Sequence, residues 1–142
     1  MITPPVGAPQ APLPIVTAET EAFWRGGREG KLLIARCGAC GFYVHPPLPI
    51  CPQCLNTTIT PTPVSGRATL ASFTVNHQAW TSDMVVPFVI GVVELIEQPS
   101  VRLTTNIVCT PLDRIVIGMQ LRVIFSQRED VWLPLFLECL AE

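Results

Sequence analysis

Two pairs of cysteines constrain this 142-residue sequence more than any other feature. Cys37 and Cys40 form the first pair, Cys51 and Cys54 form the second, and ten residues lie between the pairs. Four thiolates at this spacing can surround one tetrahedral ion, and such a set selects zinc or, less often, iron. The spacing therefore predicts a structural zinc site, with iron as an adventitious substitute.

Other uses of these cysteines fit the sequence less well. Disulfides suit small secreted proteins, and no secretory signal is visible, whereas a thioredoxin-like redox pair needs no second pair at metal spacing. Gly41 follows the first pair, where a tight turn often needs a positive φ. The second pair continues with Leu55 and Asn56, and Asn56 is the better residue for the corresponding left-handed turn.

Composition favours a subunit over a protein that works alone. Hydrophobic residues make up 49% of the chain and charged residues only 14%, so some apolar surface is expected to face a partner. A net charge of −2 disfavours nucleic-acid binding, which depends on clustered lysine and arginine. The apolar run at residues 84–93 is short and contains Pro87, so no membrane span is expected. We expect a cytoplasmic protein.

The N-terminal part divides into an arm and a short helix. Residues 1–16 are rich in proline and are expected to be an extended arm, either a disordered tail, which we favour, or a segment that orders on a partner. Thr17 is expected to cap a helix over residues 18–25 that closes at Gly26 and Gly27. Phe23 and Trp24 are neighbours on this helix and should point to different sides, so one ring is free for a partner unless both cover the protein's own modules.

The cysteine pairs and the following strands predict a mainly β protein. Strands at residues 31–36 and 42–44 flank the first pair in a rubredoxin-like zinc ribbon, and His45 is expected on the ribbon surface. Residues 57–63 are expected to be a linker, with the boundary near residue 62. Five strands follow, at residues 67–75, 88–95, 101–108, 120–126 and 131–136.

A short turn or one-turn helix at residues 110–118 separates the third and fourth of these strands. This order matches a five-stranded OB-fold barrel, with a small β-sandwich as the alternative. The predicted domains are thus the arm at residues 1–16, the helix and zinc ribbon at residues 17–61, and the OB-fold at residues 62–142.

The sequence contains no recognisable catalytic motif. His45 and His77 are the two histidines, and neither sits in a nucleophile-and-base pattern. Cys109 and Cys139 are lone cysteines and receive no role. Residues 76–80, with His77 and Trp80, form the loop after the first barrel strand, where OB-folds often hold ligands. Trp80 folded back onto the barrel mouth is an equally acceptable interpretation.

Motifs spread over residues 17–136 resemble the DUF35 family. These are Thr20-Glu-Ala-Phe-Trp24, Gly30-Lys-Leu32, Cys37-Gly-Ala-Cys40-Gly41, Pro46-Pro47, Cys51-Pro-Gln-Cys54, Gly66, Glu94-Leu95, Gly118-Met119 and Leu133-Pro-Leu-Phe136. The resemblance implies a zinc ribbon followed by an OB-fold, in a small acyl-CoA-associated subunit similar to that of the phloroglucinol acetyltransferase. In such complexes the catalytic cysteine belongs to a thiolase-fold or ketoacyl-synthase-like partner.

The resemblance thus implies a non-catalytic subunit of a hetero-oligomeric acyltransferase or aldolase complex that acts on an acyl or acyl-CoA substrate. Phe23 and Trp24 are the candidate partner interface, and His77 and Trp80 the candidate acyl or CoA passage. The alternatives are a free-standing acyl-CoA-binding protein and, against the charge, a single-stranded nucleic-acid module.

Overall fold

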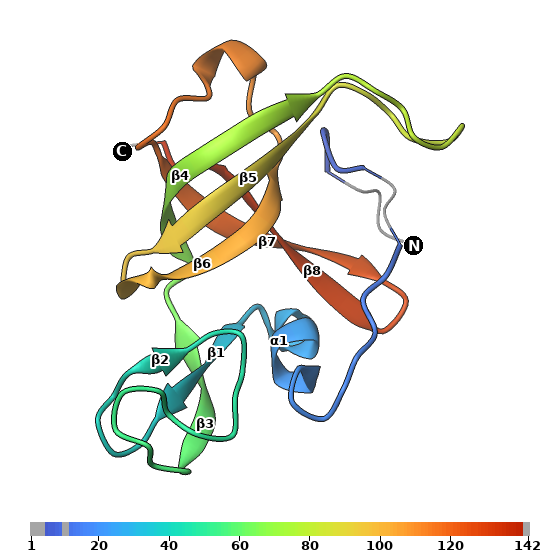
Figure 1. Ribbon diagram of the computed structural model, residues 1–142. Coiled ribbons are helices and arrows are strands. Elements are labelled where there is room, and N and C mark those ends of the chain that lie inside the picture. The colour runs from blue at the N-terminus through green and yellow to red at the C-terminus, as the bar shows by residue number, and fades with distance from the viewer. Residues whose placement is uncertain (1–4, 10–11, 141–142) are drawn as a thin grey trace.

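The computed structural model describes residues 5–9 and 12–140, and its chain forms two β modules joined by one continuous stretch (Figure 1). The mainly β prediction is confirmed, with one α-helix, two short 3₁₀ helices and a closed five-strand barrel. In chain order the elements are α1 (Glu21–Arg25), η1 (Gly26–Glu29), β1 (Leu32–Cys37), β2 (Tyr43–Val44), β3 (Ile59–Val64), β4 (Arg67–Asn76), β5 (Phe88–Leu95), β6 (Gln98–Ile107), η2 (Leu112–Arg114), β7 (Gln120–Arg128) and β8 (Val131–Glu138).

The zinc-ribbon module is a three-stranded antiparallel sheet in the order β2-β1-β3. The expected linker at residues 57–63 is wrong, because β3 occupies most of it and pairs with β1 along its length. Pro61 and Pro63 suggested a linker, but β3 is an edge strand, where a residue without an N–H group leaves no partner unsatisfied.

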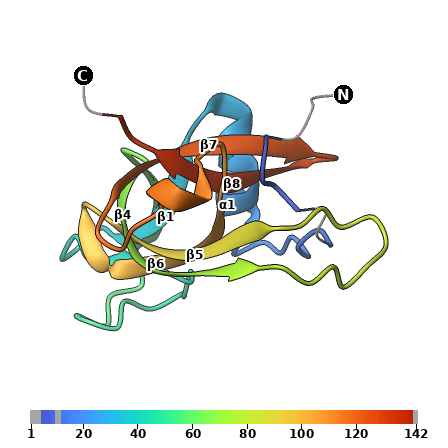
Figure 2. The same cartoon turned by 90° about the horizontal axis from the view of Figure 1, so that it is seen from above.

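The second module is a closed barrel with the strand order β4-β5-β6-β8-β7. Figure 2 shows it from above, with the β4–β5 hairpin reaching well beyond the barrel. The side chains of β4 do not alternate strictly between its two faces, because a bulge shifts the register between Leu70 and Ser72. Phe73 and Val75 therefore pack against the same core as Ala68 and Leu70.

The barrel closes through a short parallel seam between β6 and β8, in which Ile107 pairs with Phe136. Pro134 lies on β8 two residues before Phe136 and has no N–H group to extend this ladder. The hydroxyl of Thr105 on β6 donates to the Pro134 carbonyl at 2.9 Å instead. Ile107 and Phe136 are the only described pair of this ladder, and the preceding residues of both strands, 102–106 and 133–135, line a groove.

The first helix is shorter than expected and begins later. Thr20, not Thr17, occupies the position before the first helical residue, and the two threonines hydrogen-bond to each other. The chain does not stop at Gly26 and Gly27 but continues as η1 and ends at Gly30, whose φ is +71°. A side chain at Gly27 would collide with Trp132 and Phe125, so this glycine lets the helical segment lie against the β7–β8 hairpin.

One hydrophobic core joins the two modules. Leu32 and Ile34 of β1 belong to the same buried cluster as Leu70, Leu121 and Phe136 of the barrel. Gln98 also links the modules, because its amide donates to the Tyr43 carbonyl and accepts from the Tyr43 N–H, both at 2.9 Å.

The described part of the N-terminal arm lies against the barrel. The Val6 carbonyl accepts a hydrogen bond from the Cys109 N–H at 2.8 Å, and Pro12 and Pro14 border the groove beside the seam. The rest of the predicted arm, residues 1–4 and 10–11, lies outside the described residues. Within residues 5–9 and 12–140, no helix is long and apolar enough to cross a membrane.

Candidate metal centre and seam groove

The two cysteine pairs form turns with the same backbone hydrogen bonds. In the first, the Gly41 N–H donates to the Cys37 carbonyl at 2.9 Å, and in the second the Leu55 N–H donates to the Cys51 carbonyl at 2.9 Å. The Cys37 and Cys51 N–H groups also donate, each at 2.9 Å, to the carbonyls of Phe42 and Asn56. The turns are therefore structural equivalents that face each other.

The second turn corrects one expectation from the sequence. Leu55, not Asn56, occupies the left-handed position equivalent to Gly41, with φ values of +65° and +79°. The Asn56 side chain instead accepts the Thr58 N–H at 2.8 Å and shapes the entry to β3. Leu55 is 73% exposed, so the position keeps a strained residue that gains little from packing.

The four sulfurs are arranged as a metal site. All four lie within 4.8 Å of one another, with Cys37 and Cys54 at 3.5 Å and Cys40 and Cys51 at 3.6 Å. A tetrahedral zinc ion with Zn–S bonds near 2.3 Å needs sulfurs about 3.8 Å apart, so the set fits. The Cys40 N–H donates to the Cys37 sulfur and lowers the pKa of that thiol to about 6. Four cysteines complete the shell, which is typical of a structural site without a position for substrate.

A groove of about 560 Å³ lies beside the seam, between the barrel, α1 and the ribbon. Its floor and sides come from residues 102–106 of β6 and 133–135 of β8, and its rim comes from the arm, α1 and the segment after β2. The side chains that line it include Phe23, Trp24, His45, Pro46, Pro47, Thr105 and Leu133. Among the described lining residues, none is a cysteine, serine, lysine, aspartate or glutamate.

The two aromatic residues of α1 do not point apart as the sequence suggested. The rings of Phe23 and Trp24 meet edge to face with centroids 4.8 Å apart, and both line the groove. Phe23 also packs against the shared core, and both residues are half-buried. The pair thus joins the protein's own core to an open groove.

His45 is not on the ribbon surface as expected. Its ring lies 5.2 Å from the Phe23 ring, and its buried Nδ1 has no hydrogen-bond partner among the described residues. Burial lowers the pKa of His45 below its ordinary value, so the neutral ring is favoured. His45 therefore contributes a neutral ring to the groove wall.

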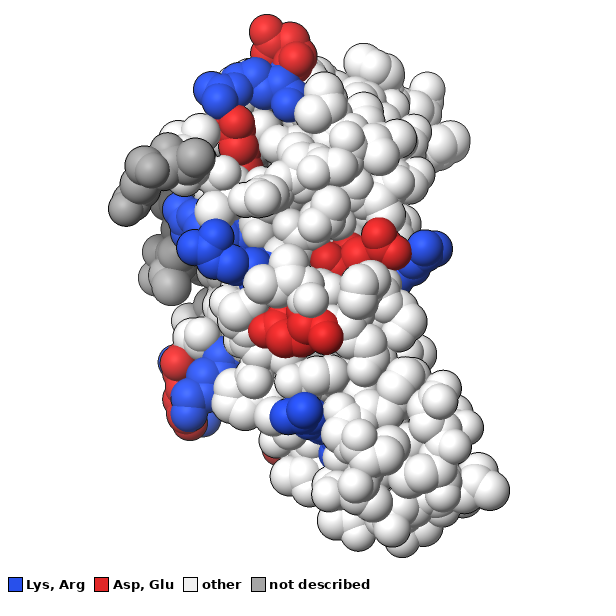
Figure 3. Space-filling model, turned by 90° about the vertical axis from the view of Figure 1, so that its left-hand side faces the viewer, with Lys and Arg blue, Asp and Glu red and all other residues white. Residues whose placement is uncertain are grey.

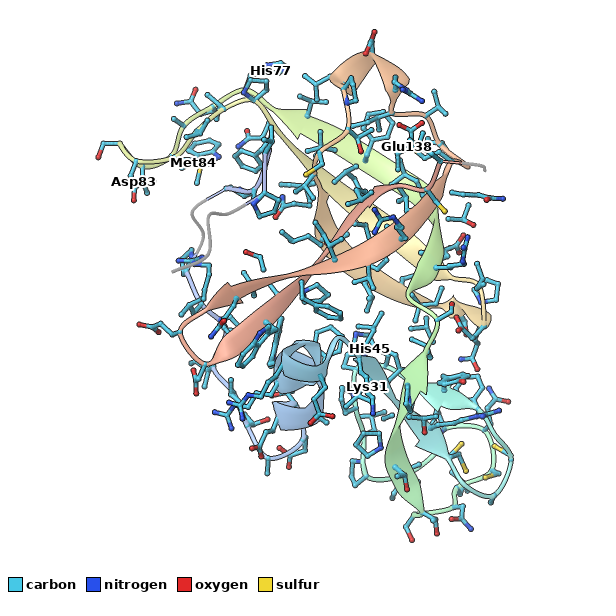
Figure 4. All side chains as sticks on the ribbon, turned by 180° about the vertical axis from the view of Figure 1, so that it is seen from behind. Lys31, His45, His77, Asp83, Met84 and Glu138 are labelled. Carbon is cyan, nitrogen blue, oxygen red and sulfur yellow. The ribbon has the colours of Figure 1, made fainter. Side chains whose placement is uncertain are left out.

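His77 and Trp80 lie elsewhere, on the β4–β5 hairpin. Both are exposed, Trp80 at 73%, so the tryptophan is not folded back onto the barrel. In Figure 4 His77 lies at the far end of the molecule from His45. The two pairs of candidate residues, on α1 and on the hairpin, thus belong to different surfaces.

Sequence reasoning missed the seam residues Thr105 and Pro134, which create the groove. The signal was available in part, because a proline inside an otherwise apolar strand indicates an interrupted ladder. Which strand it would face depends on the barrel order, and no local pattern reveals that.

Comparison with protein families matches most of the chain, from residue 24 to residue 126. Residues 24–60 match the rubredoxin-like zinc ribbon domain of ChsH2, and residues 61–126 match the C-terminal OB-fold domain of ChsH2. The two matches are contiguous and cover the cysteine site and most of the barrel.

Two curated relatives are longer proteins. The chain is 30% identical over 126 residues to a probable enoyl-CoA hydratase alpha subunit of Thermomonospora curvata, covering 88% of this chain and 39% of that protein. It is 36% identical over 117 residues to the 3-oxo-4,17-pregnadiene-20-carboxyl-CoA hydratase alpha subunit of Mycobacterium tuberculosis, covering 82% and 37%. The chain therefore spans less than half the length of either relative.

Solved structures share the whole fold. A chain of the Ltp2-ChsH2(DUF35) aldolase is 29% identical and superimposes with a TM-score of 0.81, covering 90% of this chain and all of that one. A DUF35 protein of unknown function from Sulfolobus solfataricus is 15% identical with a TM-score of 0.62 over 86% of each chain, which shows a common fold.

Proposed function

This chain belongs to the DUF35 family of zinc-ribbon and OB-fold proteins, and from that premise we propose that it is a non-catalytic, zinc-binding subunit of a thiolase-fold aldolase or acyltransferase. The observation that carries the proposal is its likeness to the DUF35 chain of the Ltp2-ChsH2(DUF35) aldolase, all of which it covers. An isolated OB-fold would leave many functions open, but the ribbon, helix and barrel match together.

The chemistry of the groove supports a role without catalysis. Acyl transfer and aldol cleavage need a nucleophile that is activated by a base, and His45 is the only side chain of the described lining that could act as that base. His45 packs against Phe23 with its Nδ1 buried, so this nitrogen is poorly placed to exchange protons with a substrate. The reacting groups are therefore assigned to the partner.

The aromatic pair on α1 is the proposed centre of the partner contact. Phe23 anchors the pair in the protein's own core, while Trp24 sits beside it at the open groove. Half-exposed aromatic rings held rigidly in this way are the side chains that contribute most at interface centres. The zinc site stabilises the ribbon, whose residues 45–47 form the facing rim of the groove.

His77 and Trp80 are proposed to border the acyl or CoA passage of the assembled complex. The hairpin that carries them projects from the barrel (Figure 2), so it can reach across a partner surface. His77→Ala and Trp80→Ala should alter the kinetics of the complex and leave the fold intact, because both side chains are exposed. Unchanged kinetics in both variants would remove the hairpin from the passage.

Co-expression with a thiolase-fold protein tests the main proposal. We expect the two chains to elute together in size-exclusion chromatography, and acyl-CoA cleavage or transfer to require the partner's catalytic cysteine. The chain alone should show no turnover. Turnover by the isolated chain at the rate of the complex would refute the non-catalytic role.

A free-standing acyl-CoA-binding protein is the second candidate, because the curated relatives are named for reactions of CoA thioesters. The hydratase activity in those names is not proposed for this chain, which covers 39% and 37% of those proteins. Calorimetric titration of the isolated chain with an acyl-CoA separates the two candidates. Tight binding with no assembly on a thiolase-fold partner would favour the second.

A further inference from the structure

A second cavity, of about 670 Å³, lies where the starts of β4 and β7 meet the end of β8. Arg67, Gln120, Arg122, Glu138 and Cys139 are among the residues that line it. Figure 3 looks onto this side of the molecule, where blue side chains gather toward the left edge at about mid-height. In Figure 4 Glu138 lies at the opposite end of the molecule from the ribbon.

The two arginines stand directly opposite each other on neighbouring strands. Arg67 is the first residue of β4, Arg122 is its partner on β7, and both side chains are exposed. Like charges in this cross-strand position repel each other and destabilise the pairing of the strands. The pair is therefore an arrangement that the fold alone does not favour.

No described carboxylate forms an ion pair with either arginine. Glu138 borders the same cavity, but Arg114 binds its carboxylate at 2.6 Å. The other polar side chains near the two arginines are a cysteine and an amide: Arg67 Nη1 donates to the Cys139 sulfur at 3.2 Å, and Gln120 lines the same cavity.

We propose that Arg67 and Arg122 form a binding site for a phosphate-bearing anion. Two guanidinium groups present parallel N–H donors whose geometry matches phosphate oxygens, and an anion between them would turn repulsion into attraction. The Gln120 amide supplies a further donor at the same wall. A free phosphate compound and the phosphates of a nucleotide cofactor share this chemistry. The proposal does not depend on the function proposed above.

Calorimetric titration with sodium pyrophosphate, against sodium chloride at equal ionic strength, tests the site. We expect saturable binding to the wild-type chain, at least about tenfold weaker in Arg67→Gln and in Arg122→Gln, because each variant removes a charge-assisted hydrogen bond. Lys31→Gln is the matched control, since it removes one exposed positive charge near the ribbon (Figure 4) and should bind as the wild type does.

Stability separates a ligand site from a structural role. Without pyrophosphate, Arg122→Gln should unfold at the same temperature as the wild type or higher, because the repulsion is gone. Adding pyrophosphate should raise the unfolding temperature of the wild type more than that of Arg122→Gln. Coenzyme A in place of pyrophosphate distinguishes the two sources: tighter, arginine-dependent binding identifies a nucleotide cofactor, and equal binding identifies a free anion. The proposal would be overturned if the wild-type chain showed no saturable pyrophosphate binding. It would also be overturned if the double variant Arg67→Gln/Arg122→Gln bound pyrophosphate as tightly as the wild type does.

Discussion

Leu55 is the residue at which local strain and metal binding meet most directly. It adopts the left-handed conformation that its equivalent, Gly41, adopts without penalty. An L-residue with a side chain is destabilised in this conformation by roughly 1–2 kcal/mol. Replacing it with glycine removes the strain but raises the entropy of the unfolded chain, which offsets part of the gain in stability. The strain persists because the Leu55 N–H must reach the Cys51 carbonyl for the turn to close.

Leu55→Gly should therefore stabilise the metal-loaded protein by about 0.5–1 kcal/mol, measured by chemical denaturation. Gly41→Ala is the matched variant and should lower the stability. Its new Cβ would lie 3.3 Å from Arg36 Nη2, and alanine would have to adopt the positive φ of this position. A Leu55→Gly protein less stable than the wild type would show that the exposed leucine makes a contact that outweighs the strain.

His45 should make the folded protein less stable in mild acid. Its pKa in the folded chain is lowered by burial from the ordinary 6.5, so the unfolded chain takes up a proton that the folded chain resists. Stability is therefore retained above pH 6.5 and falls as the pH drops from 6.5 toward the folded pKa. His45→Asn should flatten this dependence in urea unfolding with excess zinc.

His77→Asn is the control for this dependence, because His77 is exposed on the hairpin. Its unfolding should follow the wild-type curve at every pH. If the two variants changed the slope equally, burial of His45 would not be its cause.

At the level of elements, α1 makes the clearest functional prediction. Trp24→Ala should reduce co-purification with a thiolase-fold partner by tenfold or more, since truncating a ring at an interface centre commonly costs about 2 kcal/mol. The variant should keep its metal and nearly all of its thermal stability. Phe23→Ala should lower the unfolding temperature as well, because Phe23 packs against the shared core.

The control is Leu112→Ala on η2, a large apolar residue that is 44% exposed and lies outside the groove. Co-purification of Leu112→Ala should match the wild type. Unchanged co-purification of Trp24→Ala, with the partner otherwise bound, would place the interface away from α1.

The elements that sequence reasoning predicted well are those whose pattern is set locally. The four cysteines are recognisable by spacing, and β5 has the predicted bounds, residues 88–95, because its apolar run is almost continuous. β3 was missed because a proline excludes a central strand but not an edge strand, and only the sheet order shows which applies.

The bulge in β4 and the groove could not have been predicted in the same way. The bulge at Leu70 reverses which residues face the core, a choice made by packing against β5 and invisible in the alternation itself. The groove depends on five separate segments that meet only in the folded chain: β6, β8, the arm, α1 and the segment after β2. Phe23 and Trp24 were identified as candidates, but their contact with each other and with His45 arises only in the folded chain.

For the whole molecule, the shared core decides how far the effect of the metal extends. Leu32 and Ile34 come from the strand that leads into Cys37, and they are buried with barrel residues. If the ribbon lost its structure, these side chains would leave the barrel core and expose apolar surface there. Metal binding should therefore stabilise both modules as one cooperative unit.

Cys37→Ser should remove the bound zinc and lower the stability of the barrel together with that of the ribbon. Structural zinc contributes folding free energy directly, so we expect a loss of several kcal/mol, on the order of 3 or more, and a single calorimetric transition at lower temperature. Elemental analysis should find one zinc per chain in the wild type and in Cys109→Ser, a control that changes an exposed cysteine outside the sulfur cluster. A barrel transition that stays at the wild-type temperature in Cys37→Ser would show that the modules fold independently, despite the leucine and isoleucine that they share.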